Sequence, residues 1–150
     1  MKVTIGADHA GYELKEKVKQ WLAQKGVELE DRGTNSAESV DYPDFAQRVG
    51  EDVASGRADF GVLVCGSGIG MAIAANKVPG VRAANVSSEI EAELSREHND
   101  ANVLSIGSRI LDEGTAHKIV DKFLETKFAG GRHQRRVDKI SALEHASAPK

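Results

Sequence analysis

The lone cysteine of this chain stands at a position suited to chemistry. Cys65 ends the apolar run Phe60-Gly-Val-Leu-Val and is followed at once by the glycine-rich segment Gly66-Ser-Gly-Ile-Gly70. A helix-like run then begins near Ala72. Backbone N–H groups converge where a strand turns through glycines into a helix, and they favour negative charge on a sulfur or on a ligand oxygen. We therefore expect the chemistry of this protein at this turn.

The glycine-rich segment fits neither of two familiar anion loops. Gly66 and Gly68 match the first two glycines of the dinucleotide fingerprint G-x-G-x-x-G, but Met71 takes the place of the third. Met71 also occupies the position at which a Cys-x5-Arg phosphatase loop carries its arginine. What remains is either a nest of N–H groups for a developing oxyanion or a tight turn without chemistry. Ser67 either donates to the thiolate or caps the following helix.

Other polar residues stand near the ends of predicted strands. Asp8 and His9 follow the first strand; they form either an ordinary helix cap with a surface histidine, or ligands for sugar hydroxyls or phosphate. His98 and Asn99 precede the last strand, where a histidine is either a surface residue or a proton shuttle.

A basic segment closes the chain. Arg132 and Arg136 are four residues apart, so on a helix both guanidinium groups share one face and can bind one phosphate, unless that face is simply solvated. The residues from Lys127 onward carry a net charge of +4, and the remainder carries −7. This asymmetry favours an anionic small ligand or a partner subunit over nucleic acid.

The elements that position these residues alternate between strands and amphipathic helices. Apolar strand patterns are followed by helical patterns with buried faces at i, i+4 and i+7 spacing. The strands are expected at residues 2–7, 27–31, 60–64, 81–86 and 103–106. This order predicts an α/β fold, a Rossmann-like three-layer α/β/α sandwich with a five-stranded parallel sheet and a C-terminal helical extension. Ligands of such sheets bind beyond the carboxyl ends of the strands, where Asp8, Cys65 and Arg109 would lie.

Length and composition are those of an ordinary globular domain. The 150 residues predict a single domain, 1–150, in which residues 130–150 form an extension with little apolar face of its own, which is expected to pack on another surface. We find no run long enough to span a membrane and no signal peptide. One unpaired cysteine suits a reducing cytoplasm, and the sequence suggests no metal site and no organic cofactor.

Taken together, the motifs resemble one family. They are Gly6-Ala-Asp8-His9-Ala-Gly11, Asp41-Tyr42-Pro43-Asp44, Cys65-Gly-Ser-Gly-Ile-Gly70, Ala75-Asn76-Lys77, His98-Asn99-Asp100-Ala-Asn102 and Gly131-Arg132-His133-Gln134-Arg-Arg136, in this order. The chain from its first strand to about Ile140 is similar to the sugar-phosphate isomerases of the ribose-5-phosphate isomerase B type, a family shared with the galactose-6-phosphate isomerase subunits.

The resemblance implies an aldose–ketose isomerase that interconverts ribose 5-phosphate and ribulose 5-phosphate, in the pentose phosphate pathway, through an enediolate. Cys65 would be the base, with Ser67 beside it, and His98 would assist ring opening. Substrate would be held by Asp8, His9, Gly66, Gly68, Ile69, Gly70, Asn99, Arg109, Arg132 and Arg136. The resemblance also implies a homodimer, or a dimer of dimers, with active sites shared between subunits, so that the extension, residues 130–150, would pack on a neighbouring subunit. Two alternatives remain open: an isomerase of galactose or allose 6-phosphate, and a non-catalytic phosphosugar-binding module.

Overall fold

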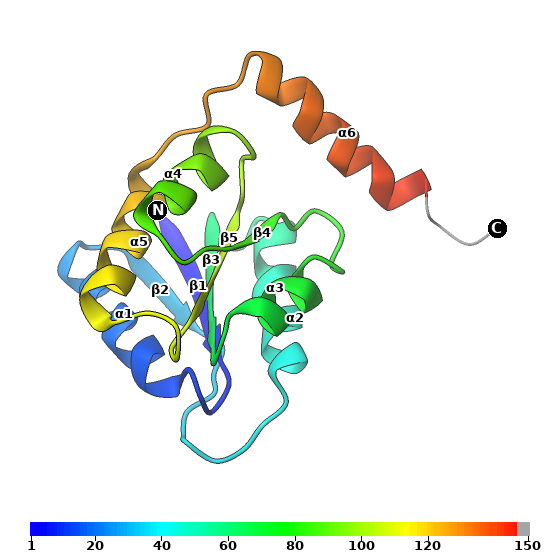
Figure 1. The fold of residues 1–150 in the computed structure, drawn as a ribbon. Coiled ribbons are helices and arrows are strands. Elements are labelled where there is room, and N and C mark those ends of the chain that lie inside the picture. The colour runs from blue at the N-terminus through cyan, green and yellow to red at the C-terminus, as the bar shows by residue number, and fades with distance from the viewer. Residues whose placement is uncertain (147–150) are drawn as a thin grey trace.

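The computed structural model describes residues 1–146 as five strands and six helices in regular alternation (Figure 1). The strands are β1 (Lys2–Ala7), β2 (Glu28–Asp31), β3 (Phe60–Cys65), β4 (Ala83–Asn85) and β5 (Val103–Gly107). The helices are α1 (Tyr12–Gln24), α2 (Tyr42–Ala54), α3 (Ile69–Ala75), α4 (Glu89–Glu97), α5 (Glu113–Glu125) and α6 (Arg132–Ala146).

All neighbouring strands are parallel, in the order β2-β1-β3-β5-β4. The predicted α/β class and the five strands are confirmed. The sequence did not indicate the order of the strands, nor α4 as a separate helix. β3 lies at the centre of the sheet, and Cys65 at its end is paired with Gly107 at the end of β5. The thiol therefore lies at the carboxyl edge of the most enclosed strand.

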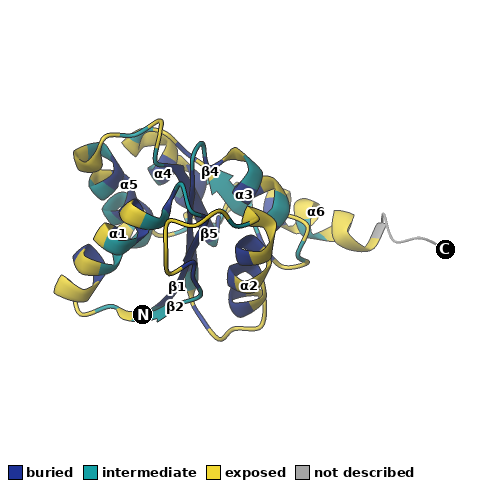
Figure 2. Ribbon diagram, turned by 90° about the horizontal axis from the view of Figure 1, so that it is seen from below, coloured by how far each residue is buried: buried dark blue, intermediate teal, exposed yellow. Residues whose placement is uncertain are grey.

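Helices cover both faces of the sheet, which gives the three predicted layers (Figure 2). α1, α4 and α5 pack on one face, over a core that contains Val18, Ile119 and Phe123. α2 and α3 pack on the other face, over a core that contains Val49 and Met71. Because side chains alternate along a strand, Val64 enters the first core and Leu63 and Cys65 enter the second. The sulfur is thus directed toward α2 and α3.

The helix faces expected from periodicity are buried. They comprise Leu14, Val18, Trp21 and Leu22 on α1, Phe45, Val49 and Val53 on α2, and Ala116, Ile119, Val120 and Phe123 on α5; Leu124, expected on the same face of α5, is half-buried and packs against this core. Burying side chains of this size stabilises a fold by about 1.5–3 kcal/mol each relative to exposure. These faces fix the helices against the sheet and hold the loops between them in place.

α6 differs from the other helices because it projects away from the layers (Figure 1). Val137 on this helix is buried, while Ile140 is 45% exposed. The Glu144 carboxylate accepts a hydrogen bond of 2.8 Å from the backbone N–H of Gly80, which ties the far end of the helix to the body. The predicted helical extension is therefore present.

Candidate functional site

The Cys65 thiol is held by the glycine loop that follows it. The side chain is 5% exposed, and its Sγ accepts a hydrogen bond of 3.1 Å from the backbone N–H of Gly68. An N–H donor aimed at sulfur stabilises the thiolate more than the neutral thiol. Gly68 reaches this position with φ +81°, in the left-handed region that favours glycine. The loop thus places a backbone N–H donor against the sulfur.

Ser67 is placed by the loop on the helix side. Its Oγ accepts a hydrogen bond of 3.1 Å from the N–H of Ile69, the first residue of α3. This bond places the Ser67 hydroxyl at the start of α3, although the N-cap position itself is taken by Gly68. Because a hydroxyl can accept and donate at the same time, this bond leaves the O–H of Ser67 able to donate to another group.

A cavity of about 560 Å³ opens beside the sulfur. Its lining brings together residues from the ends of β1 and β3 and from the loop after β5. They are Asp8, Tyr42, Cys65, Gly66, Ser67, Ile69, Gly70, Ile73, Arg109 and Ile110. The carboxyl edge of the sheet therefore gathers Asp8, Cys65 and Arg109 as the topology rule predicted. A cavity of this size holds a small phosphorylated metabolite.

Arg109 lies close against the glycine loop. Its backbone N–H donates to the carbonyl of Gly66 at 2.9 Å. Its Nη1 would lie 3.1 Å from a Cβ placed on Gly66, so the absence of a side chain there lets the guanidinium lie across the loop. Arg109 consequently lines the same cavity as the Cys65 thiol.

Asp8 and His9 are both used locally. Asp8 Oδ1 accepts the N–H of Gly11 at 3.0 Å and so shapes the entry to α1. His9 Nδ1 accepts the N–H of Val40 at 3.1 Å, which ties the loop before α2 to the end of β1. When Nδ1 is an acceptor in a neutral imidazole, the proton lies on Nε2, which then serves as a donor. His9 does not line the cavity, whereas Asp8 does.

The remaining predicted site residues lie at the opposite edge of the sheet, where the strands begin. They are His98, Asn99, Arg132 and Arg136. His98 follows α4 and precedes the start of β5, whereas Cys65 is paired with the last residue of β5. His98 stacks on His133 of α6 with ring centroids 4.3 Å apart. Desolvation lowers the pKa of His133, and the adjoining His98, Arg132 and Arg136 lower it further. One copy of the chain therefore forms two separate clusters, one around the thiol and one around His98, Arg132 and Arg136.

Arg96 fixes the second cluster to the body. Its guanidinium donates to the carbonyl of Ala101 at 2.6 Å and to Thr126 at 3.3 Å, and it packs over the ring of Phe60. The N–H of Ala129 also donates to the carbonyl of Glu97 at 3.0 Å. The end of α4 and the segment leading into α6 are thus held together.

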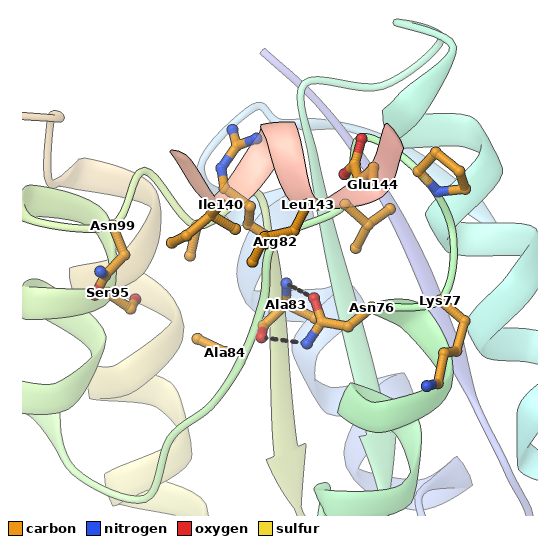
Figure 3. Close-up of a pocket in the computed structure, with 13 residues that line it drawn as sticks. Asn76, Lys77, Arg82, Ala83, Ala84, Ser95, Asn99, Ile140, Leu143 and Glu144 are labelled. Atoms are coloured by element: carbon orange, nitrogen blue, oxygen red, sulfur yellow. Dashed lines mark hydrogen bonds between the residues drawn. The ribbon is translucent and has the colours of Figure 1, made fainter. Parts of the chain in front are cut away.

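Asn99 lines a second cavity, of about 620 Å³, beneath α6 (Figure 3). In Figure 3 the Asn76 side chain pairs with the backbone of Ala83, donating at 2.9 Å and accepting at 2.8 Å. β4 is an edge strand, and these bonds occupy backbone groups that a further strand would otherwise pair with. The cavity contains the apolar Ile140 together with Lys77 and Arg82, and it is separate from the cavity at Cys65.

Two site features were not assigned from the sequence. Tyr42 lines the cavity at Cys65, and a Cβ on Gly70 would lie 2.5 Å from its ring. His133 stacks on His98. Tyr42 stands beside Pro43 and His133 stands between Arg132 and Arg136, so both lie inside motifs that the sequence analysis had already named. That position in a motif was the sequence signal that could have pointed to them.

Within residues 1–146 we find no group of three or more His, Cys, Asp or Glu side chains that could hold a metal ion. Nor does that part of the chain contain a helix both long and apolar enough to cross a bilayer.

The fold and the cavity define a class: a three-layer α/β protein with a hydrogen-bonded thiol and an arginine at the carboxyl edge of its sheet. A ribose/galactose isomerase family model matches residues 3–140, and the chain belongs to this family. It is 48% identical over 143 residues to Escherichia coli ribose-5-phosphate isomerase B, covering 95% of this chain and 96% of that protein.

Solved structures agree. The Clostridium thermocellum ribose-5-phosphate isomerase B superposes with a TM-score of 0.98 at 49% identity, covering 99% of this chain and 100% of the other. The Mycoplasma genitalium enzyme, solved with bound ribulose 5-phosphate, gives 0.94 at 44% identity, with 97% of each chain covered. The resemblance seen in the motifs is confirmed.

Proposed function

We propose that this protein is an aldose–ketose isomerase that interconverts ribose 5-phosphate and ribulose 5-phosphate in the cytoplasm. The observation that carries the proposal is the Cys65 thiol, buried at the end of β3, hydrogen-bonded by Gly68 N–H and facing a cavity with Arg109. Relatives that are 44–49% identical over nearly their whole length and are named ribose-5-phosphate isomerase B support this substrate.

In the proposed reaction the Cys65 thiolate removes the proton from C2 of the open-chain aldose and returns it to C1. A proton moves from O2 to O1 in the same conversion, so the sugar is neither oxidised nor reduced overall. The intermediate is an enediolate, and backbone N–H groups of Gly66 to Gly70 stabilise its oxyanion. One such donor typically contributes about 3–4 kcal/mol of transition-state stabilisation.

The cluster around Cys65 lacks the histidine and the two arginines of the second cluster. A second copy of the chain would supply them. Arg132 and Arg136 begin α6 and expose their side chains, as a phosphate site requires, but they lie at the edge of the sheet opposite Cys65. We infer that the described part of the extension, residues 130–146, packs on a neighbouring subunit and brings His98, Asn99 and these arginines to its thiol; residues 147–150 of the predicted extension lie outside the described residues. The rim of the Cys65 cavity supports this: Ile69, Ile73 and Ile110 are each more than half exposed, as at a surface covered by a partner.

The base is tested by replacing Cys65 with alanine. Loss of a general base typically lowers kcat by about 10²–10⁴-fold, and we expect a loss in that range for ribulose 5-phosphate formation. Cys65→Ser is the matched control for packing, because it keeps the size of the side chain. Near-normal turnover in folded Cys65→Ala protein would exclude the thiol as the base and leave only a phosphosugar-binding role.

The shared site is tested by mixing Cys65→Ala with Arg136→Ala, assayed at a substrate concentration so far below the raised KM of Arg136→Ala that neither variant alone shows activity. In a shared-site homodimer, random exchange yields one mixed dimer in two, and each mixed dimer has one intact site, so about a quarter of wild-type activity returns. Arg136→Ala alone should raise KM strongly without lowering the melting temperature. If mixing restores nothing although exchange is verified, each chain has its own complete site.

Pentose and hexose substrates are separated by direct comparison. The relatives named above favour the pentose phosphate over galactose or allose 6-phosphate. We expect kcat/KM for ribose 5-phosphate to exceed that for either hexose phosphate. The reverse ranking would assign the chain to the hexose phosphate branch of the family.

A further inference from the structure

Two side chains on neighbouring strands hold the glycine loop from behind. Asn85 on β4 and Ser105 on β5 are directly paired in the sheet. Asn85 Nδ2 donates to the carbonyl of Ser67 at 3.3 Å and to that of Ser105 at 3.1 Å. Ser105 Oγ donates to the carbonyl of Gly68 at 2.6 Å, and its side chain is fully buried. Two consecutive carbonyls of the loop are thus bound by strand side chains.

The N–H groups of the same two peptides point toward the thiol and its neighbour. The peptide whose carbonyl belongs to Ser67 carries the N–H of Gly68, which donates to Cys65 Sγ at 3.1 Å. The next peptide, with the Gly68 carbonyl, carries the N–H of Ile69, which donates to Ser67 Oγ. A peptide unit is planar and trans, so binding its carbonyl on one side fixes the direction of its N–H on the other.

Glycine makes this restraint necessary. Gly68 has no side chain to restrict its rotation, and its conformation at φ +81° is one of several that glycine adopts at similar cost. Without the two donors the Ser67–Gly68 peptide could turn, and the sulfur would lose its N–H donor. Asn85 Nδ2 packs directly over the Cα of Gly68, which is where a Cβ would otherwise point.

We propose that Asn85 and Ser105 are positioning residues for the isomerase site: they fix the Ser67–Gly68–Ile69 peptides so that Gly68 N–H stabilises the Cys65 thiolate. The inference rests on the proposed function, because it assigns a task to the base of that reaction. Neither residue lines the Cys65 cavity, so both act through the loop.

The test uses Ser105→Ala and Asn85→Leu in the full-length protein. Ser105→Ala removes the hydroxyl donor and reduces the volume, whereas Asn85→Leu keeps the branched shape and replaces the amide donor with bulkier methyl groups. Because Cys65 is the single cysteine, the rate of iodoacetamide alkylation against pH reports on this thiol alone. We expect the midpoint of that profile to rise by about half a pH unit or more, since the thiolate loses part of its hydrogen bond. We also expect kcat to fall about tenfold while KM changes less than kcat.

Asn102→Ala is the matched control. Asn102 also anchors the β4 segment, accepting from Arg82 N–H at 2.7 Å and donating to the Gly80 carbonyl at 2.9 Å, but it does so away from the glycine loop. It should lower the melting temperature and leave the alkylation midpoint at the wild-type value. If Ser105→Ala and Asn85→Leu keep the wild-type midpoint, or if Asn102→Ala shifts it equally, the inference is wrong.

Alkylation also separates this inference from the proposed function. An inactive wild-type protein whose alkylation midpoint still rises in both variants would refute the isomerase and leave the positioning role standing. An active wild-type protein whose two variants keep the wild-type alkylation midpoint would support the isomerase and refute the positioning role.

Discussion

Replacing Gly68 with alanine tests how the glycine loop is built. Gly68 has φ +81°, and a left-handed conformation costs a residue with a side chain about 1–2 kcal/mol. The new Cβ would also overlap Asn85 Nδ2 and lie 2.9 Å from the carbonyl carbon of Ile106. Ile106 belongs to β5, which is paired on both sides, so its backbone cannot yield.

The displaced group must therefore be Asn85 or the loop itself. If Asn85 turns away, its two hydrogen bonds to Ser67 and Ser105 are lost, at about 1 kcal/mol each. Adding the backbone strain gives a total loss of about 3–4 kcal/mol in the free energy of unfolding. For a chain of this length, that corresponds to a fall of roughly 10 °C in melting temperature.

Gly26→Ala is the matched control. Gly26 has φ +73°, but no atom lies within 4 Å of the Cβ that alanine would add. Gly26→Ala therefore costs only the backbone strain, about 1–2 kcal/mol, and should melt roughly 3–6 °C below wild type. Both variants are melted at one protein concentration, because association with a partner shifts the melting temperature.

The activity assay completes the test. Gly68→Ala moves the N–H that donates to Cys65 Sγ, so kcat should fall about a hundredfold, while Gly26→Ala should keep wild-type kcat. The reasoning is refuted if Gly68→Ala melts with Gly26→Ala and isomerises within twofold of wild type.

Two further predictions concern stability. Burial raises the pKa of Asp31, but hydrogen bonds from Lys15, Lys19 and Gly33 N–H outweigh it and hold the pKa below its ordinary value of 3.8. The ionised carboxylate therefore stabilises the fold above that value, and the contribution is lost as pH falls through the lowered pKa. In urea unfolding, Asp31→Asn should be less stable than wild type at pH 7, and the gap should shrink below pH 3.8; a constant gap from pH 6 to pH 3 contradicts this. Ser88→Ala should cost about 1 kcal/mol, because Ser88 Oγ caps α4 by accepting Glu91 N–H at 3.2 Å; a loss as small as that of a solvent-exposed serine would contradict the cap.

The position of Cys65 shows how far local sequence can determine a site. An apolar run ending in cysteine and glycines is enough to predict a strand, a turn and a helix, since each depends on neighbours along the chain. The parallel arrangement then predicts that Asp8, Cys65 and Arg109 share one edge, and the structure gathers all three around one cavity. Periodicity likewise identified the buried faces of α1, α2 and α5.

Tertiary structure decided what depends on contacts between distant segments. The exchange of β4 and β5 in the sheet order is set by pairing, and it is this order that brings Asn85 and Ser105 behind the glycine loop. His98 lies opposite Cys65 because it precedes β5 whereas Cys65 ends the parallel β3, and the stacking of His133 on His98 brings Arg136 to the same place. Sequence spacing determines which face of an element a residue occupies, but only packing decides which elements meet. For this reason the gathering of Asp8, Cys65 and Arg109 at one edge could be predicted from the chain, whereas the contact between His133 of α6 and His98 could not.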